Sequence, residues 1–145
     1  MKDSPPGTPT RLAALKLLDA VLRRGAPLEA AMDGACAELD RGDDRAFAHA
    51  IAAETLRRLD DLDRLIDAST ERPLPPDSKA RMLLRMALVQ ALVLKTPAHA
   101  AITTILPLAD GGPRKLIHAV FSRTMREGAT LPDPPHLPAA VADRW

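Results

Sequence analysis

The chain has 145 residues, of which 46% are hydrophobic and 27% charged, and this balance indicates one globular domain rather than a disordered tract. Aromatic residues make up 2% of the chain, which argues against a module that binds nucleic acid by stacking bases on an aromatic sheet. The formal net charge is +1, so any attraction to a polyanion must come from the way the charges are distributed.

The first predicted helices follow a mobile segment rich in proline and glycine, residues 1–9. Thr10 is suited to cap the first helix because its side-chain oxygen can accept a hydrogen bond from a backbone amide, and Gly25 is suited to end it. A second helix is expected to begin at Pro27, because proline is tolerated in the first turn, and to end near Gly42.

A long third segment follows, in which apolar residues recur at helical spacing. Asp43 or Asp44 is expected to cap this segment, which extends to about Ala68. The adjacent Asp60 and Asp61 mark a point where the segment can divide. The sequence therefore predicts one helix or two helices in this region.

The most apolar helix is predicted in the second half of the chain. The prolines within residues 72–76 predict a loop before it, because proline cannot continue a helix. Asp77 or Ser78 then caps a helix that extends to Leu94 and is apolar almost all round, which is typical of the middle of a bundle. Gln90 is expected to satisfy a buried backbone group there.

Two further helices complete the predicted bundle. Thr96 and Pro97 are typical of a cap and first-turn residue for a helix that stops at Gly111, and Pro107 can shorten it. The last full helix is expected over residues 113–127. Because no period-two run or hairpin turn indicates a strand, we expect an all-α bundle of six to seven helices.

The predicted helices and the prolines and glycines between them also indicate the domain organisation. Residues 10–128 are predicted as one domain and the Pro-rich residues 129–145 as a linker toward a missing part. Residues 82–94 form an apolar run too short to cross a bilayer, and the N-terminus lacks the apolar core of a secretory signal. The single Cys36 is typical of a reducing compartment. We therefore expect a cytoplasmic protein with no membrane partner.

Motifs for a reaction or a bound cofactor are absent from the sequence. There is no Gly-rich nucleotide loop, no HExxH segment, and no histidine pair at ligand spacing. An enzyme site inside the bundle would need convergent arginines and glutamates. Glu54 is the one glutamate outside the predicted helix ends and loops. We expect no catalytic residue, cofactor or metal in this chain.

The charges are segregated along the sequence. Residues 1–24 carry a net charge of +3, residues 25–72 carry −6, and residues 73–128 carry +5. A fold that brings the first and third segments together would create a basic face that favours a polyanion such as RNA. On composition alone, ordinary solvated helix surfaces are the simpler explanation, so the pattern indicates a class of partner and not its identity.

Several short segments occur in a characteristic order. They are Arg11-x-x-Ala14, Asp44-Arg45-Ala46, Leu56-Arg57, Leu84-Arg85-Met86, Pro97-Ala98-His99-Ala100-Ala101 and Leu116-Ile117-His118-Ala119-Val120. Together they resemble the NusB-like RNA-binding domain at the N-terminus of ribosomal RNA (cytosine-C5) methyltransferases of the Sun/Fmu (RsmB) family. The resemblance implies a longer enzyme that uses S-adenosylmethionine, with a C-terminal methyltransferase domain in cis. It implies that this chain docks ribosomal RNA and is not catalytic in isolation.

Docking with few aromatics should use basic side chains on phosphates. The candidates are Arg11, Lys16, Lys79, Arg81, Arg85, Arg114, Lys115, Arg123 and Arg126. Arg85 is either a paired core residue or the inner edge of the RNA face. The alternative function is a NusB-type protein-interaction adaptor, as in transcription antitermination, with a ribosomal protein as partner. Salt distinguishes the two, because phosphate contacts weaken steeply as salt rises.

Overall fold

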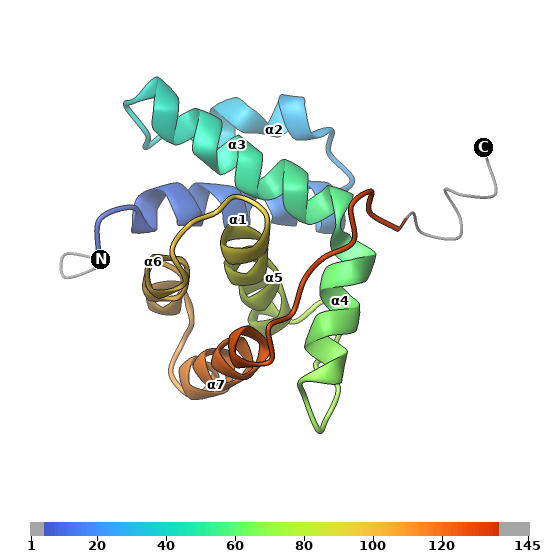
Figure 1. Ribbon diagram of the computed structural model, residues 1–145. Helices are drawn as coiled ribbons and strands as arrows, with labels where there is room; N and C mark the ends of the chain where they lie inside the picture. The colour runs from blue at the N-terminus through green and yellow to red at the C-terminus, as the bar shows by residue number, and fades with distance from the viewer. Residues whose placement is uncertain (1–4, 137–145) are drawn as a thin grey trace.

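The computed structural model describes residues 5–136, and these residues form an all-α bundle with no strand (Figure 1). The α-helices are α1 (Thr8–Arg24), α2 (Leu28–Ala35), α3 (Gly42–Arg57), α4 (Leu59–Ala68), α5 (Lys79–Leu92), α6 (Ala98–Thr103) and α7 (Pro113–Arg126). A short 3₁₀ helix, η1 (Leu106–Leu108), lies between α6 and α7. The prediction of an all-α bundle is confirmed. None of the helices in the described residues combines the length and apolarity that a membrane crossing requires.

The central helix is α5, as its apolar sequence predicts. Every residue from 81 to 90 is buried, and α5 packs against α3, α4, α6 and α7. Figure 1 shows α5 in the middle of the bundle with the other helices around it. Leu83, Leu84 and Leu88 are fully buried, and each such side chain contributes about 1.5–3 kcal/mol by leaving water.

Helices α1, α2 and α3 form one side of the bundle. α1 packs against both α2 and α3, and its buried face includes Ala13, Ala14, Leu17 and Leu18. The contact residues of α2 include Ala31 and Ala35, whose small side chains permit the close approach of two helices. No residue of α2 is fully buried. α2 therefore packs on the outside of α1 and is not part of the core.

Several helix starts differ from the sequence prediction. α1 begins at Thr8 and not after Thr10, which is buried inside the helix. Gly7 is the residue before the helix, and its φ of 94° is accessible to glycine without strain. α3 begins at Gly42 with Arg41 before it, so neither Asp43 nor Asp44 caps the helix.

Two helix ends also differ from the prediction. α2 stops at Ala35 rather than near Gly42, because tertiary contacts and not propensity decide where so short a helix ends. The predicted break in the third segment exists, but Arg58 forms it between α3 and α4 rather than the Asp60 and Asp61 pair.

The second half of the chain follows its sequence signals more closely. The Arg81 backbone N–H donates to Ser78 Oγ at 3.2 Å, so Ser78 is the cap of α5. α6 follows Pro97, which occupies the cap position that Thr96 was expected to fill. α6 ends at Thr103 and not at Gly111, and Pro107 lies beyond it in η1, so the helix is shorter than predicted.

Residues 129–136 fold back across the bundle after α7. Figure 1 shows this segment passing along α4. Arg58 Nη1 donates to the Pro132 carbonyl at 2.9 Å. The His136 backbone N–H donates to Asp61 Oδ2 at 2.9 Å, and His136 Nδ1 lies 2.7 Å from Asp61 Oδ1. The first part of the predicted linker is therefore attached to α4 and to Arg58, the residue between α3 and α4. Residues 137–145, and residues 1–4 of the predicted N-terminal segment, lie outside the described residues.

Candidate nucleic-acid interface

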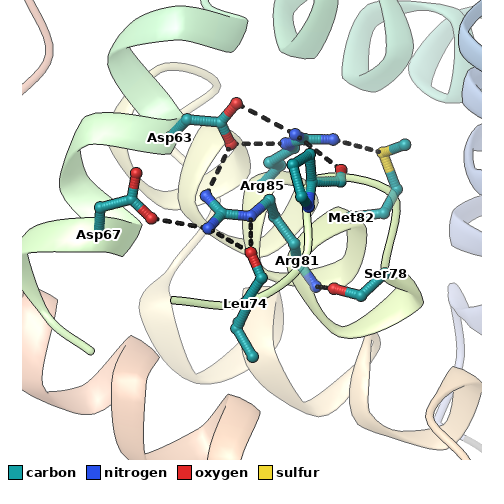
Figure 2. Close-up of polar contacts among 8 residues, drawn as sticks. Asp63, Asp67, Leu74, Ser78, Arg81, Met82 and Arg85 are labelled. Carbon is teal, nitrogen blue, oxygen red and sulfur yellow. Dashed lines mark hydrogen bonds and ion pairs between the residues drawn. The ribbon is translucent and has the colours of Figure 1, made fainter. Parts of the chain in front are cut away.

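Two of the candidate arginines, Arg81 and Arg85, lie inside the bundle and point toward α4 (Figure 2). Each residue is 4% exposed. Arg85 holds Asp63 with two hydrogen bonds, from Nε at 2.8 Å and from Nη2 at 3.0 Å. Arg81 Nη1 donates to the same carboxylate at 3.2 Å. The alternatives that the sequence left for Arg85 are therefore decided in favour of a paired core residue.

Arg81 also fixes the loop before α5. Its Nη2 donates to Asp67 Oδ1 at 2.6 Å, and its Nε and Nη2 donate to the Leu74 carbonyl at 3.1 and 2.7 Å. Burial lowers the pKa of Arg81, but the hydrogen bonds that Arg81 donates to Asp67 and Asp63 outweigh burial and hold the pKa above its ordinary value. The side chain stays charged and its donors are occupied, so Arg81 orders the protein and does not reach a ligand at the surface.

Arg11 is also an interior residue. It is 8% exposed, and its Nε donates to Gln90 Oε1 at 2.9 Å. Its guanidinium carbon lies 4.9 Å from the centroid of the Phe47 ring, an arrangement that stabilises the cation. Burial lowers the pKa of Arg11 from its ordinary value. Gln90 Nε2 donates to the Met86 carbonyl at 3.1 Å, so the backbone role predicted for Gln90 is combined with a bond to Arg11.

Three exposed candidates have a partner within the chain. Lys79 Nζ lies 3.4 Å from Asp110 Oδ2, and Arg123 Nε lies 3.0 Å from Glu127 Oε1. Arg114 Nε donates to the Ala109 carbonyl at 3.0 Å. Exposed pairs of this kind are weak, about 0–1 kcal/mol, so the side chains remain available to a polyanion.

The remaining candidates are Lys16, Lys115 and Arg126, all exposed. Among residues 5–136, no hydrogen bond or ion pair engages their side chains. Lys115 and Arg126 belong to α7, whose sequence contains no acidic residue. With Arg114 and Arg123 they give α7 an exposed basic side.

Lys16 lies in a different place. It lines a groove between α1 and α2 together with Arg24, Ala31 and Ala35. Figure 1 shows α1 and α7 on opposite sides of α5. The structure therefore does not join the basic residues of the first and last helices in one face. The charges gather on two surfaces, of which the α7 side is the more basic.

Sequence reasoning missed Arg72, an exposed residue of the loop before α5. Its side chain has no partner among the described residues, and it lies across a groove from Arg123 of α7. No helical periodicity marks a loop residue, so only the tertiary arrangement places Arg72 beside the basic helix. We call the set of Arg72, Arg114, Lys115, Arg123 and Arg126 the α7 surface.

The bundle and the order of its helices can be compared with known protein families. The protein-family model described as "NusB family" matches residues 8–126. The chain therefore belongs to the NusB family. It is 38% identical over 127 residues to "Ribosomal RNA small subunit methyltransferase B" of Xanthomonas campestris pv. campestris, covering 84% of this chain and 29% of that protein. It is 34% identical over 128 residues to the protein of the same name from Pseudomonas putida, covering 83% of this chain and 29% of that protein.

A solved structure shares the fold. "Crystal Structure of Antitermination Factors NusB and NusE in complex with dsRNA" matches with a TM-score of 0.72 and 19% identity, covering 83% of this chain and 96% of that chain. The similarity confirms the NusB-like bundle. The methyltransferase relatives are much longer than this chain, which spans 29% of the length of each.

Proposed function

We propose that this chain is the RNA-docking part of a ribosomal RNA methyltransferase and is not catalytic by itself. The observation that carries the proposal is the α7 surface, where exposed cations lie on a helix with no acidic residue. Exposed cations bind phosphates irrespective of base sequence. The identity of 34–38% to methyltransferase B proteins supports the ribosomal RNA as ligand and the cytoplasm as location.

The methyl-transfer step belongs, in this proposal, to a C-terminal domain in cis. The cofactor would be S-adenosylmethionine, which supplies the methyl group. In the interior, the side chains of Arg11, Arg81, Arg85 and Gln90 already bond other groups of the protein, so none of them is free to hold this cofactor. We therefore assign no step of the reaction to this chain.

An anisotropy titration with a labelled ribosomal RNA hairpin at low salt tests the docking role. The unchanged chain should bind, and the double variant Lys115→Glu, Arg126→Glu should bind about tenfold more weakly because phosphates then face anions. The matched control is Lys16→Glu, Arg24→Glu, which reverses exposed charges in the α1–α2 groove. We expect the control to change the affinity by less than about threefold.

The absence of hairpin binding by the unchanged chain would contradict the proposal. A larger loss in the control pair than in the α7 pair would move the interface to α1 and α2. The non-catalytic role is tested with radiolabelled S-adenosylmethionine and the same RNA. We expect no incorporation of label, and methylated RNA would contradict this part of the proposal.

A protein-interaction adaptor is the competing function. The structural neighbour was solved with NusE as well as double-stranded RNA, and the groove between α1 and α2 is lined by small apolar residues that a protein could cover. Binding to a ribosomal protein that persists at high salt, without RNA binding at low salt, would favour this function.

A further inference from the structure

A groove lies on the α7 surface between α7 and the loop that follows α4. Its volume is about 480 Å³, which is within the range of about 300–1,000 Å³ typical of small-molecule sites. Leu74, Leu116, Ala119 and Val120 give it an apolar lining. Leu116 is 42% exposed although it is a large apolar residue.

The walls of the groove are fixed by contacts from the interior. Arg81 holds the Leu74 carbonyl with two hydrogen bonds. Thr124 Oγ1 of α7 donates to Ser69 Oγ at 3.0 Å, which ties the end of α4 to α7. The opening is therefore set by the fold and needs little rearrangement to accept a ligand.

The polar groups of the groove are unevenly satisfied. Arg72 and Arg123 lie among its lining residues. Thr70 also lines it, and its buried Oγ1 has no hydrogen-bond partner among the described residues. The lining carboxylate, Glu71, can only accept hydrogen bonds. A matching ligand needs an apolar body, an anionic group and at least one hydrogen-bond donor.

An unpaired ribonucleotide has these properties. Its base is flat and can lie on apolar side chains or on an arginine plane, its phosphate pairs with arginine, and its 2′-hydroxyl and amino groups donate hydrogen bonds. A paired base in an A-form helix cannot enter such a groove, because base pairing keeps it in the stack.

We propose that this groove receives one unpaired nucleotide of the docked RNA, with its base against Leu74 and Leu116 and its phosphate between Arg72 and Arg123. The proposal rests on the proposed RNA-docking function and adds a preference for single-stranded features. The cations elsewhere on α7 bind the backbone of paired and unpaired RNA alike. The groove is the part that distinguishes them.

Two RNAs of equal length test the proposal, a hairpin with an unpaired loop and a continuous duplex with the same stem. The full chain should bind the hairpin about tenfold more tightly, since each accommodated base contributes that order of affinity. Ala119→Phe fills the groove from an exposed position of α7. It should reduce hairpin affinity to the duplex level and leave duplex affinity unchanged.

The matched control is Ala46→Phe, which adds the same ring to an exposed alanine of α3. It should retain the preference for the hairpin, and thermal unfolding should show both variants folded. Cross-linking of a 4-thiouridine placed in the loop should map to residues 69–74 or to α7.

Equal affinity of the unchanged chain for both RNAs would overturn the groove proposal while leaving the docking function intact. The same holds if Ala119→Phe keeps the preference, which would give the groove another occupant such as a protein segment. Binding of neither RNA would overturn the docking function together with the groove.

Discussion

Among residues 5–136, Asp63 is the one carboxylate that pairs with both buried arginines of α5. It accepts hydrogen bonds from Arg81 and Arg85. Asp63→Ala leaves two buried cations without this partner, and we expect the free energy of unfolding to fall by about 3 kcal/mol. Urea denaturation at neutral pH measures the change.

The control for this substitution is Asp67→Ala. Asp67 contacts Arg81 alone, and its side chain is 55% exposed. Its removal should cost no more than about 1 kcal/mol. Equal effects of the two substitutions would contradict the central role assigned to Asp63.

Asp61 links stability to pH. Burial raises its pKa, but the hydrogen bonds and charge of His136 outweigh burial, so the pKa of Asp61 is lowered in the folded protein. A lowered folded-state pKa gives a contribution to stability that is present above the unfolded value of about 3.9 and is lost as the pH falls through the folded value. The unchanged chain should therefore lose stability below about pH 4.

Asp61→Asn removes this titration, so its urea midpoint should fall less between pH 7 and pH 3 than that of the unchanged chain. Asp40→Asn is the control, because Asp40 is exposed and has no partner among the described residues. An acid response that is the same for Asp61→Asn and the unchanged chain would contradict the linkage.

At the scale of elements, residues 129–136 form a strap, by which we mean a segment that is held against α4 by hydrogen bonds with Arg58 and Asp61. A chain that ends at Gly128 loses the Pro132 carbonyl that Arg58 binds and the His136 groups that Asp61 binds. We expect this chain to be less stable by about 2–4 kcal/mol, because a buried carboxylate loses its hydrogen bonds.

A chain that ends at Pro138 keeps these contacts and is the matched control. Thermal unfolding of both truncations gives the comparison. If the chain ending at Gly128 is as stable as the control, the domain boundary predicted at residue 128 gains support and the strap contributes nothing.

The helices of this bundle could be predicted because their signals are local. The apolar run of α5 indicates a central helix, and Ser78 has the side chain and position of a cap. The predicted starts of α1 and α3 are too late, because Thr10 and Asp43 have side chains suited to a cap, whereas the helices begin at Thr8 and Gly42 without a side-chain cap.

The site was harder to predict from the sequence than the fold. A basic residue in a helical pattern has the same appearance whether it faces solvent or a carboxylate on another helix. Arg81 and Arg85 donate hydrogen bonds to Asp63, which is 18 and 22 residues away in the sequence. Arg11 donates to Gln90, which is 79 residues away. These pairings depend on the fold, so sequence alone could not separate the interior arginines from those of the α7 surface.

At the scale of the whole molecule, the buried and the exposed cations have distinct tasks in the proposed function. Interior arginines hold α4, α5 and the loop between them in register. In the proposed function, the exposed cations of the α7 surface contact the RNA backbone. In the longer methyltransferases, such a domain would hold ribosomal RNA while a separate domain carries out the reaction.

The salt dependence of RNA binding tests this central claim most directly. The logarithm of the association constant should fall linearly with the logarithm of salt concentration, and each phosphate contact contributes roughly 0.7–0.9 to the slope. Lys115→Ala combined with Arg126→Ala should therefore make the slope less steep by about 1–2. A slope that stays unchanged in this variant, and becomes shallower in Lys16→Ala combined with Arg24→Ala, would contradict the assignment of RNA docking to the α7 surface.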